Sequence, residues 1–365
     1  PELKETFNMG HQRSGAQAQA LAGAVLAYAE NIEDPSVLAP VVELICHKHV
    51  SLNIQAPEYD IVGENLLHSI SEVLNIPMEH ELIEAWGLAY GQLADLFIQT
   101  EQKIYLEHQQ TQGSWLGWRE FLIAEKVKES DEITSFYLVP KDNGALPKYK
   151  AGQYVTVRVL VPELGIKQPR QYSLSDCASG QYLRISVKRE DAKVEGQDPG
   201  YVSSTLHQYL NEHDVVELSA PTGNFFLVNP EKTNVLISAG VGLTPMVAML
   251  NQLLTENTDP NEKLSFWQKI KAQFSHAPEK PSIHFIHAAR NSRVHAMKNA
   301  IQGLAQQHDN LNVFVAYEQT DSKDVLGRDY HAEGRLNLKQ LDAKMLPKDA
   351  DYYLCGPMPF MAEQH

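Results

Sequence analysis

Three polar side chains in the first third of the sequence have the types and positions of a metal-binding histidine and its support. His49 falls on an apolar stripe of one predicted helix, Tyr59 on the apolar face of a second, and Glu101 on that of a third. A carboxylate on an apolar face is costly unless it is partnered. A metal-bound histidine usually gives its other ring nitrogen to such a group. A core histidine bonded to a carbonyl oxygen remains the alternative.

The helices that carry these groups are predicted from apolar spacings of three and four residues. Asp34-Pro35 is typical of a helix start, with an N-cap followed by proline. We find no convincing strand pattern up to about residue 108. The three predicted stripes consist of Leu38, Val41, Ile45 and His49; of Tyr59, Val62, Leu66 and Val73; and of Trp86, Tyr90, Leu93, Phe97 and Glu101. His11, His47 and His68 are alternative ligands in principle, and we expect His47 to be solvated.

A second group of residues, Arg170-Gln171-Tyr172-Ser173, suits a flavin nucleotide. The Arg170 guanidinium can neutralise a pyrophosphate with a bidentate fork. Residues two apart share one face of a strand, so Arg170 and Tyr172 should point together and Ser173 away from them. Taken alone, the segment could equally be a plain half-buried strand.

The neighbouring motifs strengthen the flavin interpretation. Gly152-Gln153-Tyr154 precedes this segment, and Gly200-Tyr201-Val202-Ser203-Ser204 and Pro221-Thr222-Gly223-Asn224-Phe225-Phe226 follow it. Ser203 or Ser204 would start a helix whose free N–H groups can meet a phosphate. Six short strands separated by turn residues predict a small antiparallel barrel. These strands are Trp118 to Val127, Ile133 to Val139, Gln153 to Val161, Tyr172 to Leu174, Tyr182 to Lys188 and Val215 to Ala220.

The last third has the pattern of a nicotinamide-binding domain. An apolar strand from Asn234 to Ala239 leads into a glycine turn, and Thr244-Pro245 opens a helix from Met246 to Leu254. A strand, a glycine turn and a helix N-terminus suit a pyrophosphate. The third glycine of the usual dinucleotide spacing is missing, so a tight turn without a ligand remains possible. The predicted contact residues are Gly240, Val241, Gly242, Leu243, Thr244 and Pro245.

Further strands at Ile283 to His287, Val313 to Tyr317 and Tyr352 to Leu354 alternate with helices, which predicts a parallel sheet covered on both faces. Cys355-Gly356-Pro357 follows the last strand, at the edge where such sheets bind ligands. Arg290 and Arg293 could hold a 2′-phosphate and favour NADPH, or could be solvated. The polar segment from Asn257 to Lys280 is interpreted as an excursion between strands.

Composition narrows the class of protein. A chain of 365 residues predicts two or three domains. A net charge of −15 argues against general nucleic-acid binding. No apolar run approaches the roughly 20 residues that a membrane span needs. Cys46, Cys177 and Cys355 have no CxxC spacing, which is typical of a reducing cytoplasm and indicates no thiolate metal site. We expect both ends to lack native sequence.

The first third resembles the globin domain of bacterial flavohaemoglobins. The residues that carry this resemblance are Pro1 to Met9, Lys48-His49, Tyr59 to Glu64 and Ala85 to Gly91. It implies that His49 is the proximal haem ligand, with Tyr59 and Glu101 as its hydrogen-bond relay. It also implies that Phe7 wedges the haem, that Lys48 belongs to the haem pocket, and that Gln17 and Leu21 lie on the oxygen side. The family's distal tyrosine would precede Pro1.

The four ordered flavin motifs are similar to the ferredoxin-reductase type of FAD domain. The resemblance implies that Tyr172 packs on the flavin ring, that Ser173 lies near the hydride-accepting nitrogen and that Tyr154 is a second aromatic contact. The cysteine motif would lie beside the nicotinamide. A further family element, with a glutamate and a phenylalanine that face the flavin, has no counterpart in this sequence.

The combined expectation is a multidomain chain: an all-α globin over residues 1–110, an antiparallel β-barrel FAD domain over 114–228, and an α/β parallel-sheet NAD domain over 229–365. The resemblance implies a nitric oxide dioxygenase, in which NAD(P)H reduces FAD, FAD reduces haem b, and haem-bound oxygen converts nitric oxide to nitrate. A flavin reductase with an oxygen-storing or redox-sensing globin, and a reductase fused to a haem-free helical module, are the alternatives. We expect a cytoplasmic monomer whose distal pocket could also admit a lipid or an inhibitor.

Overall fold

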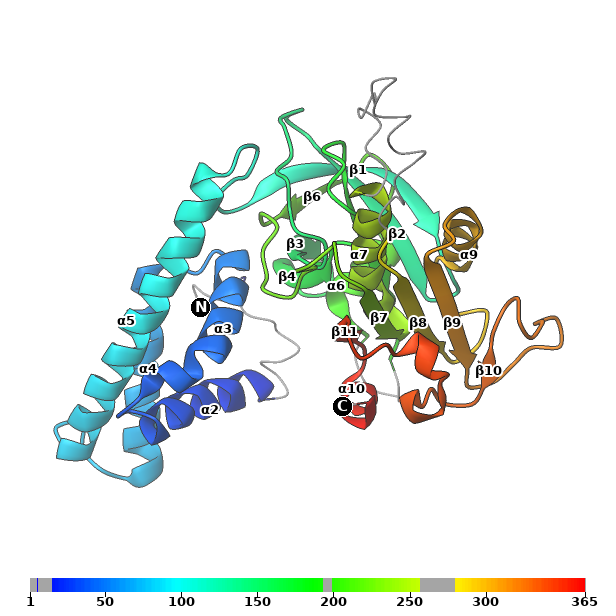
Figure 1. Ribbon diagram of the computed structural model, residues 1–365. Helices are drawn as coiled ribbons and strands as arrows, with labels where there is room; N and C mark the ends of the chain where they lie inside the picture. The colour runs from blue at the N-terminus through cyan, green and yellow to red at the C-terminus, as the bar shows by residue number, and fades with distance from the viewer. Residues whose placement is uncertain (1–4, 6–14, 193–198, 257–279, 365) are drawn as a thin grey trace, which may run out of the picture.

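The chain folds as a helical region, an antiparallel barrel and a parallel sheet, in that order (Figure 1). The computed structural model describes residues 5, 15–192, 199–256 and 280–364. The order of the three parts confirms the predicted fold class. Phe7 and residues 257–279 of the predicted excursion lie outside the described residues, and Gln17 is described only as part of a helix.

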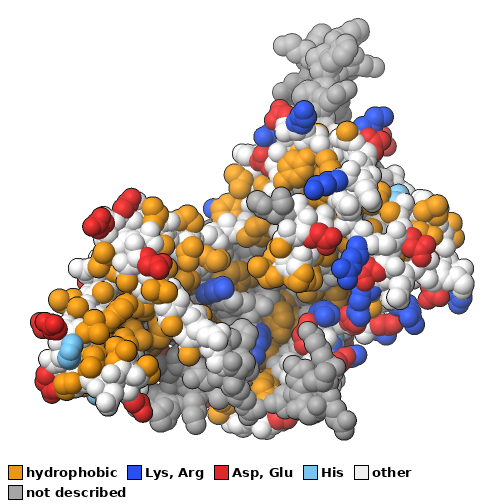
Figure 2. All heavy atoms as spheres, turned by 90° about the horizontal axis from the view of Figure 1, so that it is seen from below, with side chains coloured by type: hydrophobic (Ala, Val, Ile, Leu, Met, Phe, Trp, Pro, Cys, Tyr) orange, Lys and Arg blue, Asp and Glu red, His pale blue; other side chains and the backbone are white. Residues whose placement is uncertain are grey.

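The helical region contains no strand among its described residues, as predicted. Its core is formed where the helices before the barrel pack together, with Val42, Cys46, Leu93 and Phe97 buried at the contact. Figure 2 shows apolar side chains gathered over the outer face of this region. Its elements are α2 (Ala16–Glu30), the 3-10 helix η1 (Pro35–Leu38), α3 (Ala39–Ser51), α4 (Ala56–Leu74) and α5 (Glu81–Gln110).

Three details of the predicted helices are wrong. Asp34 caps a short 3-10 turn by accepting from Ser36 N at 3.2 Å, and α3 begins only afterwards. On α3 the buried stripe is Val42, Cys46 and Val50, whereas Val41 is 54% exposed. The helix has apolar residues on two adjoining stripes, and its packing against α5 decides which of them is buried. Val73, predicted on the apolar face of α4, is likewise exposed.

A glycine lets α4 and α5 approach closely. A Cβ at Gly63 on α4 would lie 2.4 Å from the ring of Tyr90 on α5. The Tyr90 hydroxyl donates to the carbonyl oxygen of Tyr59, 2.7 Å away. This contact fixes the start of α4, and therefore the place of the Tyr59 side chain, against the long helix that carries Glu101.

The barrel is a six-stranded antiparallel sheet in the order β4-β3-β6-β1-β2-β5. Its two outer strands meet through a bridge between Leu174 and Ile185, which closes the barrel as predicted. The fourth strand is longer than predicted, because it forms a complete ladder with β3 back to residue 166. The strands are β1 (Arg119–Lys128), β2 (Ile133–Pro140), β3 (Tyr154–Val161), β4 (Ile166–Ser173), β5 (Leu183–Lys188) and β6 (Val215–Leu218), and α6 (Tyr201–Gln208) packs against β3 and β4.

The last part is a five-stranded parallel sheet in the order β10-β9-β8-β7-β11. The predicted strands are present, and the structure adds β10, which has only two residues and was not predicted. The elements are β7 (Asn234–Ala239), η2 (Gly240–Gly242), α7 (Leu243–Glu256), β8 (Ile283–Ala289), α9 (Lys298–Gln307), β9 (Leu311–Tyr317), β10 (Ala332–Glu333), η3 (Leu338–Gln340), η4 (Ala343–Met345), β11 (Asp351–Cys355) and α10 (Met358–Gln364).

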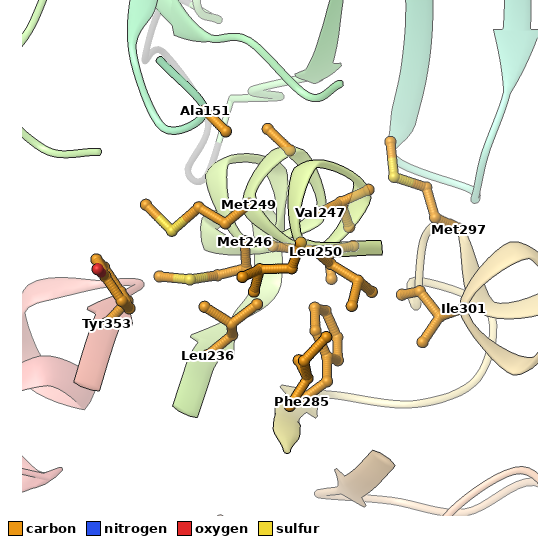
Figure 3. Packing of buried hydrophobic residues seen from close by; sticks show 14 of the residues in the cluster. Ala151, Leu236, Met246, Val247, Met249, Leu250, Phe285, Met297, Ile301 and Tyr353 are labelled. Atoms are coloured by element: carbon orange, nitrogen blue, oxygen red, sulfur yellow. The ribbon is translucent and has the colours of Figure 1, made fainter. Parts of the chain in front are cut away.

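Both faces of the parallel sheet are covered, as predicted. On one face, Leu236 and Phe285 pack against the buried side of α7, together with Ile301 of α9 (Figure 3). Val235 and Ile237 alternate with Leu236 and belong to the cluster on the opposite face, which includes residues of η3, η4 and α10. The alternation of side chains along a strand produces this division.

No single helix in the described part of the chain is long and apolar enough to cross a membrane. One bent pair of segments, Pro35–Ser51 with Ala56–Leu74, meets the length and composition requirement jointly.

Candidate haem, flavin and nicotinamide sites

Three helices bring His49, Tyr59 and Glu101 into direct contact. His49 Nδ1 lies 2.9 Å from the Tyr59 hydroxyl and 2.7 Å from Glu101 Oε1. The Tyr59 hydroxyl donates to the same carboxylate oxygen at 2.5 Å. Glu101 is 3% exposed, so its carboxylate is partnered inside the helical core. The sequence placed these side chains on three apolar faces, and the fold closes them into one triad.

The triad leaves one nitrogen of His49 available for a ligand. A carboxylate can only accept, so the proton between His49 and Glu101 belongs to Nδ1, and in the neutral imidazole the lone pair then lies on Nε2. Burial, and next the neighbouring Glu101 carboxylate, raise the pKa of the Tyr59 hydroxyl, which therefore remains a donor. A neutral imidazole with its second nitrogen hydrogen-bonded to a carboxylate is the arrangement of a metal-ligating histidine. This donor set fits a haem iron.

The structure describes the side chains of two other predicted haem-pocket residues, and neither side chain forms a hydrogen bond or ion pair with the triad in the described part of the chain. Leu21 on α2 is partly buried against the helical core, and Lys48 is exposed on α3. In the described part of the chain, no group of three or more His, Cys, Asp or Glu side chains could hold a metal ion by itself. A single protein ligand is sufficient for haem, because the porphyrin supplies the equatorial nitrogens.

The predicted flavin residues meet at the paired ends of β3 and β4. Tyr154 is paired with Ser173, Val155 with Tyr172, and Gln171 with the next residue of β3. Strand alternation puts Tyr172 on the same face as Arg170, as expected from their spacing. The motif Gly152 to Tyr154 leads into the same end of β3. There Tyr154 N donates to the Thr222 carbonyl oxygen at 2.9 Å.

Buried polar groups in this region fit a bound nucleotide. Burial lowers the pKa of the Arg170 guanidinium, which donates to the Pro169 carbonyl oxygen and has no carboxylate partner among the described residues. The hydroxyl of Ser204 on α6 is buried without a hydrogen-bond partner in the structure described. The Thr156 hydroxyl is also buried and unpartnered there, but Thr156 is paired with Gln171 and so lies on the opposite face of the strands from Arg170. A cation and a hydroxyl donor such as Arg170 and Ser204 are suited to a pyrophosphate.

The predicted helix start near Ser203 and Ser204 is wrong by two or three residues. Gly200 is the N-cap, and α6 begins at Tyr201. Ser203 Oγ donates back to Gly200 O at 3.0 Å. The two serines therefore lie inside the first turn rather than at the cap, because glycine supplies the extended N-cap backbone that a serine was expected to supply.

The glycine turn and the cysteine motif of the last part lie side by side. A Cβ at Gly242 would lie 2.4 Å from the carbonyl oxygen of Cys355 and 2.8 Å from Gly356 Cα. The chain runs from β7 outward to β10 and then returns to β11 on the other side of β7. The strand order reverses between β7 and β11, and open α/β sheets bind ligands at such a switch point.

The local structure of the glycine turn differs from the prediction. Residues 240–242 form a 3-10 turn, and α7 begins at Leu243 rather than at Met246. Thr244 and Pro245 thus occupy the first helical turn, where proline is tolerated because the first N–H groups have no intrahelical acceptor. Pro357 directly precedes α10.

The two arginines after β8 are in different surroundings. Arg290 forms an ion pair with Glu132, which lies just before β2 in the barrel. Arg293 is 67% exposed and is 3.9 Å from Asp321. The sequence offered phosphate binding or solvation for both. The structure adds a third arrangement for Arg290, a contact between the barrel and the sheet.

The expectation that His47 is solvated is wrong. Its side chain is 13% exposed, and Nδ1 lies 2.6 Å from Thr222 Oγ1 of the barrel. Ser51, four residues further along α3, accepts from Gln171 Nε2 at 2.9 Å. Sequence reasoning missed this interface because the spacing of four residues shows a shared face of a helix but not its partner. That partner consists of Gln171 on β4 and the turn that contains Thr222.

Comparison with known proteins agrees with these three parts. Residues 1–97 match the globin family, and residues 236–365 match the oxidoreductase NAD-binding domain family. The flavohemoprotein of Bordetella parapertussis is 52% identical over all of this chain and 85% of its own length. The flavohemoprotein of Rhizobium meliloti is 46% identical with the same coverage.

Solved structures show the same similarity. A flavohemoglobin from Malassezia yamatoensis with bound FAD and heme has a TM-score of 0.79 and 25% identity, covering 100% of this chain and 85% of that one. The FAD/NAD-binding domain of a nitric oxide dioxygenase from Vibrio cholerae has a TM-score of 0.55 and 36% identity, covering 67% of this chain and 89% of that one.

The fold and these similarities define an NAD(P)H-dependent haem and flavin oxidoreductase, built from a globin and a reductase module that uses FAD. Within that class, the similarity over its full length shows that the chain belongs to the flavohemoprotein family.

Proposed function

We propose that the protein is a nitric oxide dioxygenase that converts nitric oxide and oxygen to nitrate at the expense of NAD(P)H. The observation that carries this proposal is the His49–Tyr59–Glu101 triad, in a globin that is continuous with a flavin and nicotinamide module. When bound, the three cofactors supply hydride acceptance and one-electron chemistry that amino-acid side chains lack.

The chain's own residues would hold and tune these groups. His49 is proposed as the iron ligand, and the Glu101 carboxylate holds the proton on Nδ1, which makes the imidazole a stronger electron donor. Tyr59 orients that carboxylate by donating to it. Gln17, Leu21, Phe7 and Lys48 are proposed pocket residues. A more electron-donating imidazole favours oxygen activation over simple reversible binding.

The strand ends of the barrel and the switch point of the sheet are proposed as the reductase site. Arg170 would neutralise the pyrophosphate of FAD, with Tyr154, Gln171, Tyr172 and Ser173 around the flavin. The nicotinamide nucleotide would bind along residues 240–245 and the motif Cys355-Gly356-Pro357, two segments that the absence of a Cβ at Gly242 keeps in contact.

The test is to measure nitric oxide consumption by protein loaded with haem and FAD, with NADH and with NADPH, in the presence and absence of oxygen. We expect rapid consumption only with oxygen, with nitrate as the product. NAD(P)H oxidation without oxygen-dependent loss of nitric oxide would instead support a flavin reductase with an oxygen-storing or sensing globin.

We also propose a monomer in the cytoplasm. Cys46, Cys177 and Cys355 are all free thiols, which is typical of a reducing compartment. Burial, and next the Glu101 carboxylate, raise the pKa of Cys46 to about 12, which keeps this group in its thiol form. Fractionation of the native cells and sedimentation of the purified protein would test the two proposals.

A further inference from the structure

Helix α3, which carries His49, also makes direct contact with the barrel. His47 Nδ1 lies 2.6 Å from Thr222 Oγ1, and the backbone N–H of Gly223 donates to the same nitrogen at 3.3 Å. Figure 1 shows α3 on the side of the helical region that faces the barrel. The His47 imidazole of the globin part therefore accepts hydrogen bonds from one turn of the reductase part, which contains Thr222 and Gly223.

A second hydrogen bond lies one helical turn further along α3. Gln171 Nε2 on β4 donates to Ser51 Oγ at 2.9 Å, and Ser51 Oγ donates to the Lys48 carbonyl oxygen at 2.8 Å. Ser51 is 1% exposed. Residues four apart lie on one face of a helix, so His47 and Ser51 form a single contact surface. We call this pair the docking contact.

The barrel side of the docking contact consists of residues that build the flavin site. Thr222 and Tyr154 exchange backbone hydrogen bonds, each 2.9 Å long. A Cβ at Gly223 would lie 2.8 Å from the Tyr154 ring, so the turn is packed against that side chain. Gln171 lies on β4 between Arg170 and Tyr172. The docking contact thus joins the helix of the iron ligand to the framework around the flavin.

The hydrogen bonds define what His47 must supply. A backbone N–H can only donate, so Nδ1 of His47 accepts from Gly223, and the Thr222 hydroxyl can then donate to the same atom. The ring proton is on Nε2, which is 4.0 Å from the Glu43 carboxylate. Any side chain that puts an acceptor in the place of Nδ1 should preserve the contact, and alanine should not.

We propose that His47 and Ser51 are positioning residues, which hold α3 against the flavin-binding strand ends and so set the rate at which the flavin reduces the haem. This inference rests on the electron transfer in the proposed function but not on its nitric oxide chemistry. Parts of one chain move relative to each other unless their interface holds them. Losing a hydrogen bond in such an interface reduces the docked fraction, and transfer slows in proportion.

The test uses the full chain loaded with haem and FAD, mixed rapidly with NADH without oxygen. In His47→Ala we expect flavin reduction at the wild-type rate and haem reduction about tenfold slower, from the loss of the hydrogen bonds at Nδ1. His47→Asn, whose Oδ1 can replace Nδ1 as an acceptor, should restore most of the rate. His68→Ala, an exposed histidine on α4, is the matched control and should behave as wild type.

A second measurement reports on the contact without turnover. Hydrogen exchange at the Gly223 amide should speed up in His47→Ala and remain slow in His47→Asn and His68→Ala. The absorption spectrum of the haem should be the same in all four proteins, which separates docking from damage to the His49 ligand. If His47→Ala does not retain haem, Ser51→Ala takes its place, with an expected slowing of about threefold.

Wild-type haem reduction in His47→Ala, with faster exchange at Gly223, would overturn the proposal, because the contact would then be broken without consequence. Equal slowing in His47→Ala and His47→Asn would overturn it as well. If the wild-type protein does not reduce its haem with NADH, the proposed function fails, and the exchange data still decide whether His47 makes the contact.

Discussion

The helical region and the two sheet regions differ in how they bury their large side chains. Large apolar side chains remain exposed on every helix of the front part, for example Leu26, Val41, Val73 and Leu88. In the barrel and the parallel sheet, Phe121, Phe136, Phe285 and their neighbours are completely buried between strands and helices. The front part also buries the Glu101 carboxylate within its core, where an imidazole and a phenol are its hydrogen-bond partners.

This difference indicates where stability and chemistry lie. Strand ladders and closed apolar cores hold the reductase part together, so single polar substitutions there should leave the fold intact. In the front part, three side chains from three helices meet at one imidazole, and each contact contributes to both packing and ligand binding. Substitutions in the triad should therefore change the haem more than they change the flavin.

The largest effect is expected for His49→Ala. The only imidazole of the triad is lost, so haem binding should disappear while FAD binding is retained. The ratio of the Soret band to the flavin absorbance measures both. His68→Ala should keep the wild-type ratio. Unchanged haem content in His49→Ala would assign the iron to another ligand.

The reductase part can be disrupted independently by Gly242→Ala. The new Cβ would be 2.4 Å from the Cys355 carbonyl oxygen, so the turn η2 and the end of β11 must move apart. We expect NADH to bind about 5- to 150-fold more weakly, from an overpacking cost of about 1–3 kcal/mol. Fluorescence titration with NADH measures this. Gly303→Ala on α9, where a Cβ meets no atom within 4 Å, is the matched control.

Glu101→Gln should have an intermediate effect that is confined to the front part. The amide keeps the size of the side chain but loses the charge that makes His49 electron-donating. Changes of this kind next to a ligand cost about tenfold or more in activity. We expect slower nitric oxide turnover and a more positive haem potential, with flavin reduction unaltered. Glu107→Gln, exposed on the same helix, serves as the control, and an unchanged potential would remove Glu101 from the mechanism.

The smallest effect is a pH dependence of stability in the parallel sheet. Burial lowers the pKa of His287 to about 4 from its usual 6.5, and Nδ1 is 2.9 Å from Ser238 Oγ. The unfolded chain therefore binds the proton first, and stability is lost as the pH falls below 6.5. The loss should be about 1 kcal/mol between pH 6.5 and about 5.5. Hydrogen exchange of β8 amides measures it, and His287→Asn should flatten the slope.

Much of the architecture could be predicted because it depends on local patterns. Apolar spacing distinguished the helices from the strands, and the order of the motifs predicted the barrel before the parallel sheet. The triad was anticipated because a carboxylate on the apolar face of α5 needs a partner. Short or irregular elements such as η1 and β10 were missed, since a few residues carry too little periodicity.

The sequence by itself determined which side chains are available and which helix or strand carries each of them, because those properties depend on residue type and on spacing of two or three to four positions. Only the tertiary structure decided their partners. His47 meets Thr222, Arg290 meets Glu132, and Gly242 meets Cys355 across long stretches of chain. Such contacts arise from the way separate elements pack, and no local pattern contains that information.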